Sequence, residues 1–339
     1  MKIINKRKIF FTISSVIVLT SILIWIAWGL NLGIDFTGGS LLEVKYKEQG
    51  PDIEQVKQSL ADLNLEGLNI QPTGENGYIL RFKEISEETH QQILNRLNNV
   101  EDKDEQRKSD LEESEENIEI TTDAENSTME LEAEAVTVSG SEDKVIEQRF
   151  EAIGPSIGQE LKSKSIWAIL LVLIAIVFYI AWAFRKVSYP VSSWKYGIIA
   201  IITLFHDILI TLGIFIFLGK YLGLEVNTPF VAALLTILGY SVNDTIVVFD
   251  RIRENLHKYE GEFEEIVDKS VRETITRSIN TSLTTELVLL AILIFGGTTI
   301  SDFVLVLVTG ILLGAYSSIF IAAPLLVVWQ KLDWRLKKS

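Results

Sequence analysis

Six long apolar runs constrain this chain more than any other feature of its sequence. Residues 9–30 contain no charged side chain, and five further apolar runs of similar length follow, at 166–184, 196–218, 228–249, 278–300 and 303–329. A helix that crosses a bilayer needs about 20 apolar residues, and runs of this length cannot all be core helices of a chain of 339 residues. We therefore predict an integral membrane protein, whose spans must be α-helical because each backbone group in lipid needs an internal hydrogen-bond partner.

The first run shares one feature with a secretory signal peptide, since Lys2, Lys6, Arg7 and Lys8 precede its apolar part. The apolar part of a signal peptide, however, is only about 7–15 residues long and leads to a small-residue cleavage pattern. The run 9–30 is longer, and its end, AWGLNLGID, has no such pattern. We interpret it as a first transmembrane helix that is not cleaved.

Basic residues outside the runs indicate the orientation, because cytoplasmic loops are enriched in Lys and Arg. They gather in 1–8, 185–195, 250–276 and 330–339. The alternate short loops, 219–227 and 296–302, contain only one, Lys220. The pattern predicts six helices, both termini as short cytoplasmic tails, a large extracytoplasmic domain at 31–165, and a five-helix membrane bundle at 166–329.

The domain at 31–165 shows the pattern of a small α+β fold. Its segments read as a strand at 39–47, a helix at 52–65, two strands around a turn in 68–82, a helix at 86–100, and a last strand and turn at 147–158. Ser86 precedes the second helix as an N-cap, and Thr89 stands where a capping box has Glu. The order β-α-β-β-α-β predicts a ferredoxin-like fold.

Almost all of the net negative charge is in one segment of this domain. Residues 101–144 contain 17 acidic and 4 basic side chains, whereas the whole chain has a net charge of −14. The part 101–117 lacks aromatic and β-branched residues, so we expect it to form no stable structure, while 127–138 alternates as a strand would. The segment is either a solvated insertion or an acidic tail that contacts a partner.

The remainder of the chain is nearly neutral, which argues against nucleic-acid binding, because that function needs a basic surface. The chain has no cysteine and only three histidines. It therefore has no disulfide, cysteine-ligated metal site or thiol nucleophile, and little from which to build a histidine metal site. It contains no P-loop, GxSxG or HExxH motif. We expect neither an enzyme nor a cofactor.

Ionisable side chains inside the apolar runs mark the candidate functional residues, because a charge at the centre of a membrane helix costs about 2.5–3.5 kcal/mol on insertion scales. Asp244 lies six residues inside its run from Asp250, and its sequence neighbours offer no charge partner. Arg277 lies at a comparable depth at the start of the next run. The two residues are either parts of a proton relay or a static ion pair that holds two helices together. Asn243 and several hydroxyl side chains accompany them.

Other polar and small residues in the runs allow simpler interpretations. Asp207 is either a second relay or gating group or a helix–helix hydrogen bond, and the adjacent His206 is interpreted as a structural contact. Glu286 should face the bundle interior and is interpreted as a protonated, hydrogen-bonded structural residue. GILLG at 310–314 has the spacing that permits close helix approach, and Pro324 is expected to kink the last helix.

Five segments carry longer motifs: LGIDFTGGSLLEV at 32–44, LFHDILITLGIF at 204–215, GYSVNDTIVVFDRIRENL at 239–256, TRSINTSLTTEL at 276–287 and GILLGAYSSIFIAAPLLV at 310–327. These motifs resemble those of the SecF family of protein translocase subunits. Their order and spacing agree with the family over nearly the whole chain except 101–144.

The resemblance implies a six-helix half of a resistance-nodulation-division (RND) type fold, in the bacterial inner (plasma) membrane or a thylakoid-type membrane. It implies pairing with SecD, association with the SecYEG channel, and YidC and YajC as further partners. It also implies use of the proton-motive force to assist the export of preproteins.

Matching motifs also imply residue roles. Asp244 becomes the membrane aspartate of the relay and Arg277 the basic residue that faces it, and a SecD aspartate completes the relay. Our predicted relay set is Asp244, Arg277, Asp207 and Asn243. Asp35, Gly38 and Gly39 become a structural signature at the entrance to the outer domain. Glu286 and the acidic segment depart from the family pattern.

Two other functions are compatible with six membrane helices. An RND-type transporter half for small solutes would need a larger substrate-binding region than the single domain at 31–165. A non-conducting membrane scaffold would anchor partners without moving protons.

Overall fold

The structure is a computed structural model that describes residues 3–74, 76–100, 144–185 and 191–338. The chain divides into two compact units, one formed by the residues up to Phe36 together with those from Gln159 onward, and one formed by Thr37–Gly158. The predictions made for 101–143 lie outside the described residues.

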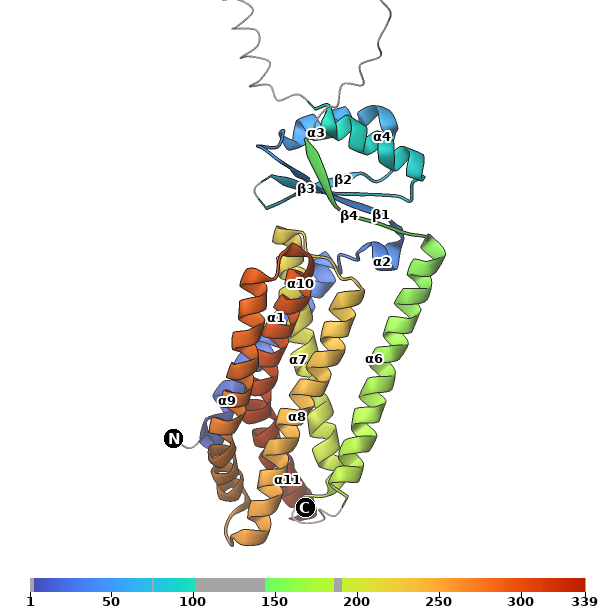
Figure 1. The fold of residues 1–339 in the computed structure, drawn as a ribbon. Coiled ribbons are helices and arrows are strands. Elements are labelled where there is room, and N and C mark those ends of the chain that lie inside the picture. Colours follow the sequence, from blue (N-terminus) through green and yellow to red (C-terminus); the bar gives the residue numbers. More distant parts are fainter. Residues whose placement is uncertain (1–2, 75, 101–143, 186–190, 339) are drawn as a thin grey trace, which may run out of the picture. The chain divides into compact units, whose positions relative to one another are not determined.

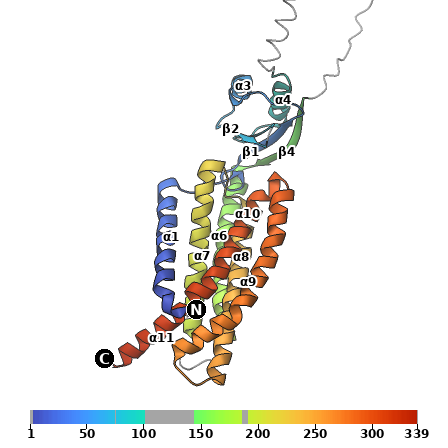
Figure 2. The same ribbon diagram turned by 90° about the vertical axis from the view of Figure 1, so that its left-hand side faces the viewer.

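The first unit consists of long helices that lie side by side (Figures 1 and 2). They are α1 (Arg7–Trp28), α6 (Pro155–Ala183), α7 (Ser193–Leu222), α8 (Thr228–Lys258), α9 (Phe263–Phe295), α10 (Thr298–Ser317) and α11 (Ala323–Lys338), with the short 3-10 helix η1 (Ile4–Lys6) before α1. Six segments among the described residues are long and apolar enough to cross a membrane, with α10 and α11 forming one of them. The predicted membrane helices are therefore confirmed. Both chain ends lie at one end of this bundle (Figure 1), which we call the termini end.

Helices α7, α8 and α10 form the interior of the bundle, where each packs against the other two. About half of the apolar stretch of each is buried, whereas the apolar stretches of α1 and α6 are mostly exposed. Phe178 of α6, for example, is 71% exposed. Apolar side chains exposed over the whole length of a helix match the hydrocarbon interior of a bilayer.

The segment 250–276, predicted as a loop, is helical on both sides of a short connection. α8 continues to Lys258, and α9 begins at Phe263. Glu254 pairs with Arg251 at 2.6 Å and also with Lys258. Such pairs, one turn apart, stabilise a helix beyond its apolar run. The prediction was wrong here because it treated the end of an apolar run as the end of the helix.

The last membrane segment changes its winding just before Pro324. Residues Ser318–Ala322 form a π-helical segment between α10 and α11. Proline has no N–H to donate to the carbonyl four residues earlier, which here belongs to Phe320 inside the π-helical segment. The irregularity expected at this proline takes the form of that segment, a feature that is frequent at functional sites in helices.

The second unit has the predicted β-α-β-β-α-β order. Its elements are β1 (Gly39–Tyr46), α3 (Ile53–Ser59) with the short 3-10 helix η2 (Ala61–Leu63), β2 (Asn69–Thr73), β3 (Gly77–Phe82), α4 (Glu87–Asn98) and β4 (Val145–Ile153). The strands form one antiparallel sheet in the order β2-β3-β1-β4. Helices α3 and α4 cover one face of it (Figure 1). Val56 and Ile93 from these helices pack on Leu42 and Leu80 of the central strands. This confirms the ferredoxin-like fold.

The N-cap predicted in this unit is confirmed, and the turn predicted after its last strand is shorter than expected. Thr89 donates its backbone N–H to the Ser86 hydroxyl at 3.3 Å, as expected of an N-cap. The turn predicted after the last strand is short, because β4 ends at Ile153 and α6 already begins at Pro155. A proline is well suited to a first helical position, since the N–H it lacks would have no partner there.

Candidate functional site

Asp207 joins the three interior helices of the bundle. It lies on α7, its side chain is 1% exposed, and its Oδ2 accepts hydrogen bonds from Ser241 Oγ of α8 at 2.6 Å and Ser317 Oγ of α10 at 2.8 Å. Nδ1 of the adjacent His206 lies 2.9 Å from the other carboxylate oxygen. Of the two roles considered for Asp207, this geometry favours the helix–helix hydrogen bond.

Close backbone approach makes this junction possible. A Cβ atom on Gly310 would lie 2.2 Å from Cδ1 of Ile237, and one on Gly314 would lie 2.9 Å from Cβ of Ser241. Any larger residue at these two positions of α10 would push α8 away. The close approach predicted from the GILLG spacing is confirmed.

Asp207→Ala is expected to lower the free energy of unfolding by about 1–2 kcal/mol, because interhelical hydrogen bonds in membranes contribute about 0.6 kcal/mol each and the truncation leaves a cavity. Asp207→Asn keeps an acceptor oxygen and should lose less than half as much. Denaturant unfolding of the chain in detergent measures both values. Unchanged stability in Asp207→Asn together with a complete loss of proton movement would instead favour the relay role.

Asp244 lies on α8 and faces α9. Its side chain is 3% exposed, and its Oδ2 accepts a hydrogen bond from Ser282 Oγ at 3.4 Å, near the upper limit for such a bond. Within the described residues it has no ion pair. The adjacent Thr245 contacts Ser318 Oγ at 2.8 Å and thereby joins α8 to the π-helical segment. Asp244 is thus a buried carboxyl group with one weak partner.

The structure does not bring Arg277 and Asn243 to the carboxyl group of Asp244. Both side chains are exposed, and Arg277, in the middle of α9, has no ion pair within the described part of the chain. The static Asp244–Arg277 pair considered above is therefore not formed in this chain. Asn280 and Thr281 are exposed beside Arg277 on α9. This leaves polar side chains on the outer surface of a helix whose remaining outer residues are largely apolar.

Sequence reasoning did not assign the donors that hold the two aspartates. No pattern in the sequence singled out Ser241, Ser282 or Ser317 as a donor. Spacing contained no signal for these pairs, because each donor lies on a different helix from the aspartate that it holds. Which helix each of them faces depends on tertiary packing.

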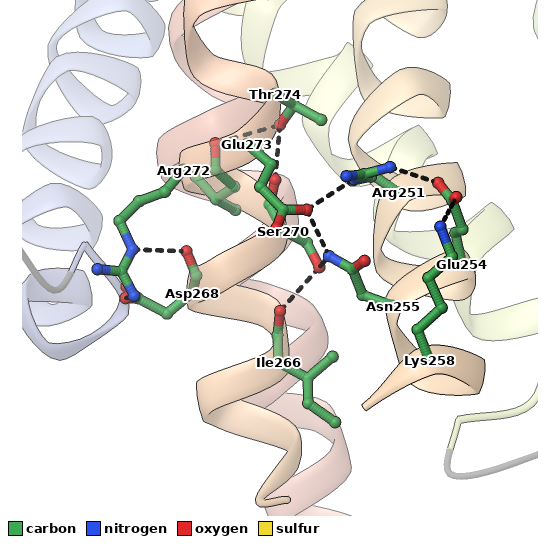
Figure 3. A network of polar contacts seen from close by, with 11 residues as sticks. Arg251, Glu254, Asn255, Lys258, Ile266, Asp268, Ser270, Arg272, Glu273 and Thr274 are labelled. Carbon is green, nitrogen blue, oxygen red and sulfur yellow. Dashed lines mark hydrogen bonds and ion pairs between the residues drawn. The ribbon is translucent and has the colours of Figure 1, made fainter. Parts of the chain in front are cut away.

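A second polar network closes the termini end of α8 and α9 (Figure 3). Glu273 accepts hydrogen bonds from Arg251 Nε at 2.7 Å and from Asn255 Nδ2 at 2.8 Å, and the same amide donates to Ser270 Oγ at 2.9 Å. Asn255 and Ser270 are fully buried. The network fixes the register of the two helices where their apolar runs end.

Asp35, predicted as a signature residue, holds the start of α8. It lies in the one-turn helix α2 (Ile34–Thr37), and its Oδ2 accepts a hydrogen bond from the backbone N–H of Thr228 at 2.7 Å. Nearby, Gly33 N–H donates to the carbonyl of Val226 at 2.8 Å, and Val226 N–H donates to that of Asn31 at 2.7 Å. The segment after α1 is thereby fastened to the helix that carries Asp244.

The two glycines of the signature meet a steric requirement. Gly38 has a φ of +75° and Gly39 a φ of +131°, a range that side chains disfavour. A Cβ atom on Gly38 would also lie 2.8 Å from Cα of Pro155. Only glycine fits where the chain enters β1 beside the first residue of α6.

Asp35→Ala is expected to destabilise the start of α8 by about 1 kcal/mol, the usual cost of losing a helix N-cap acceptor. Asp35→Asn, which also caps well, is the matched control. Hydrogen exchange should become faster at the amide of Thr228. The amide of Phe230 serves as an internal reference, because it bonds to Asn227 Oδ1 at 2.9 Å. Equal exchange at Thr228 in all three proteins would contradict a capping role.

Among the described residues, no group of three or more histidine or acidic side chains could hold a metal ion. The polar residues gathered in the bundle are carboxyl groups, hydroxyl groups and amides. These groups exchange protons and form hydrogen bonds, and intramembrane carboxyl groups mark proton or substrate pathways by default.

Comparisons with known proteins agree with this architecture. Residues 133–332 match the family model "Protein export membrane protein SecD/SecF, C-terminal", and residues 29–49 match the "SecD/SecF GG Motif". The chain is 39% identical to a protein translocase subunit SecF of Thermobaculum terrenum, over 98% of this chain and 95% of the relative. It is 34% identical to one of Anaerolinea thermophila, over 99% and 96%.

Two solved structures are also similar. SecDF from Thermus thermophilus, described as a translocon-associated membrane protein, matches with a TM-score of 0.73 and 29% identity, and SecDF in a super-membrane-facing form matches with 0.61 and 28%. The matches cover 98% and 100% of this chain but only 39% and 40% of the solved chains. The fold is therefore the membrane half predicted above. Nearly full-length matches to curated relatives, together with both family models, lead to one conclusion: the chain belongs to the SecF family of protein translocase subunits.

Proposed function

We propose that this chain works with a SecD-like partner as a proton-driven accessory unit of the Sec translocase. The unit uses the proton-motive force to assist preproteins as they leave the SecYEG channel. YidC and YajC are further candidate partners. The site of proton uptake and release on this subunit is Asp244, and Arg277 and Asn243 belong to the same relay.

One observation carries this proposal: Asp244 is buried in the membrane bundle and has no charged partner among the residues that the structure describes, while Arg277 and Asn243 are exposed. A carboxyl group that is buried and unpaired in lipid is costly and is usually functional. An exposed arginine in a membrane helix is equally costly unless another protein covers it. A partner with an acidic group on its facing surface would meet both needs, and the two SecDF chains, more than twice as long as this match, leave room for such a half.

The distribution of basic residues supports the orientation. The termini end of the bundle carries Arg7, Lys195, Arg251 and Lys331, whereas the connection between α9 and α10 carries no basic residue. By the positive-inside rule the termini end is cytoplasmic. The unit Thr37–Gly158 is then extracytoplasmic, where an emerging preprotein would meet it. The membrane is the bacterial plasma membrane or a thylakoid-type membrane.

The test is proton flux in liposomes that contain this chain with its SecD-like partner, compared with liposomes that contain either subunit alone. A pH gradient should drive flux only when both are present, because each holds part of the relay. Flux through this chain alone would contradict a shared relay. An absence of flux in all three samples, with the complex intact, would favour a non-conducting scaffold.

A further inference from the structure

Glu286 is a deeply buried acid of the bundle that the proposed relay does not use. Its side chain is 3% exposed, and neither carboxyl oxygen has a hydrogen-bond partner within the described residues. Asp207 is equally buried but accepts two hydroxyl hydrogen bonds. A structural acid is normally satisfied in this way, because a buried polar group without a partner costs free energy. The hydrogen-bonded structural role expected for Glu286 therefore has no donor to support it.

Glu286 ends a row of buried polar side chains along α9. The row has one member at every fourth position: Ser270, Thr274, Ser278, Ser282 and Glu286. Each member lies one helical turn beyond the last and about 40° further round the helix, and all five are buried. Residues on the opposite side, such as Leu283 and Leu287, are more than half exposed. The row therefore faces into the bundle for several turns.

The row joins a polar network at the termini end and contacts Asp244 near its other end, and its middle is not saturated. At the termini end, Ser270 belongs to the network of Glu273, Asn255 and Arg251 (Figure 3). Farther from the termini end, the Ser278 hydroxyl is buried with no hydrogen-bond partner in the described part of the chain, and Ser282 donates to Asp244. Glu286 lies one helical turn, about 6 Å, beyond Ser282. A side-chain rotation or one water molecule would connect the two.

Within the described residues, Glu286 forms no ion pair with the elements packed against α9. Those elements are α8, α10, α11 and η1. Their titratable groups, where the structure describes the side chains, are Tyr240, Asp244, Asp250, Arg251, Arg253, Glu254, His257 and Lys258 on α8, Asp302 and Tyr316 on α10, Lys331, Asp333 and Arg335 on α11, and Lys6 on η1 at the termini end. The contact of Asp244 with Ser282 and that of Asn255 with Ser270 show that α8 and α9 run antiparallel, so the basic residues of α8 lie toward the termini end. An ionised Glu286 would be an uncompensated buried charge.

We propose that Glu286 is a second proton-binding site of this subunit and exchanges protons with Asp244 through the Ser282 hydroxyl. In one transfer, the Glu286 carboxyl group gives its proton to the Ser282 oxygen while that hydroxyl gives its own proton to the Asp244 carboxylate. Glu286 is left as the anion and takes up the next proton, so charge and protons balance. Asp244 could then be loaded from inside this subunit as well as from the face where Arg277 is exposed.

This inference extends the proposed function, and two readouts separate the two ideas. The first is proton flux in liposomes with the SecD-like partner. The second is infrared titration of carboxyl groups in the same complex, which reports protonation whether or not flux occurs. Glu286→Gln, Ser282→Ala and Asp244→Asn are compared with Glu265→Gln, a change of the same kind at an exposed position of α9.

We expect Glu286→Gln and Ser282→Ala to lower flux about tenfold or more, since a positioned proton-transfer group contributes on the order of 10²–10⁴ in rate. Glu265→Gln should leave flux unchanged. Glu286→Gln should also remove one titrating carboxyl signal, and Asp244→Asn should shift the midpoint of that signal. Glu286→Met, which fills a similar volume without a proton, should repeat the loss of flux if the glutamine variant assembles poorly.

Normal flux in Glu286→Gln, with flux abolished in Asp244→Asn, would overturn the role of Glu286 and leave the proposed function intact. A Glu286 signal that does not titrate, or that is unaffected by Asp244→Asn, would overturn it as well. A coupled Glu286 signal without flux in the wild-type complex would contradict the proposed function and support the exchange between the two acids.

Discussion

Asp244→Asn is expected to abolish proton flux and the stimulation of preprotein export by the proton-motive force, while the complex with the SecD-like partner still assembles. The amide has nearly the same shape as the carboxyl group and can still accept the Ser282 hydrogen bond of 3.4 Å. It cannot take up or release a proton. The packing of α8 should therefore survive, and only the proton chemistry should be lost. Export in inverted membrane vesicles, with and without a proton gradient, measures the effect.

The control for this substitution is Asp250→Asn on the same helix. Asp250 is exposed and pairs with Arg253 at 2.5 Å near the termini end, a kind of surface pair that contributes about 0–1 kcal/mol. Its loss should leave export unchanged. Undiminished gradient-driven export in Asp244→Asn would show that no proton passes through this residue. Asp244 would then have a packing role only.

Gly213→Ala is expected to destabilise the bundle by about 1–3 kcal/mol, the usual cost of overpacking a tight contact. A Cβ atom on Gly213 of α7 would lie 2.3 Å from Cβ of Ser21 and 2.7 Å from its Cα. Because the obstacle includes the backbone of α1, no side-chain rotation relieves it, and the two helices must separate. Thermal unfolding in detergent should show a lower midpoint for this variant.

Gly239→Ala is the matched control, since it is the same substitution inside a helix of the same bundle. A Cβ atom there meets nothing within 4 Å. Alanine should then be neutral or stabilising by up to about 0.5–1 kcal/mol, because glycine is the poorer helix former. Equal effects at the two positions would mean that the contact between α1 and α7 does not limit stability.

Local patterns predicted most of the secondary structure correctly, and the two failures have different causes. Apolar runs identified six membrane segments, and alternating segments with turn signals identified the four strands and two helices of the second unit. The error at 250–276 arose because the end of an apolar run marks the end of the membrane-spanning part and not the end of the helix. Ion pairs between side chains one turn apart stabilise the helix beyond that point. The π-helical segment before Pro324 could not be foreseen, since a proline inside a helix allows several adjustments.

For the candidate site, too, some features were predicted from the sequence and others were not. The sequence identified Asp207, Asp244 and Glu286, because an ionisable residue inside an apolar run is recognisable from the sequence alone. It did not identify their partners. Asp207 accepts hydrogen bonds from Ser241 and Ser317, whereas Glu286 has no partner within the described residues. Two acids that look alike in sequence therefore differ fully in their surroundings.

The sequence by itself determined that the chain spans a membrane, which strand and helix order its second unit has, and where acids enter the bundle. These properties depend on the length and period of local runs of residues. Water or lipid favours burial or exposure of each segment's side chains, and this acts on each segment separately. Tertiary structure decided that Asp244 faces Ser282, that Arg277 is exposed, and that Glu286 has no hydrogen-bond partner over the described ranges. The rotation and separation of neighbouring helices are set by contacts between residues far apart in the chain, such as Gly310 with Ile237, and no local pattern specifies those contacts.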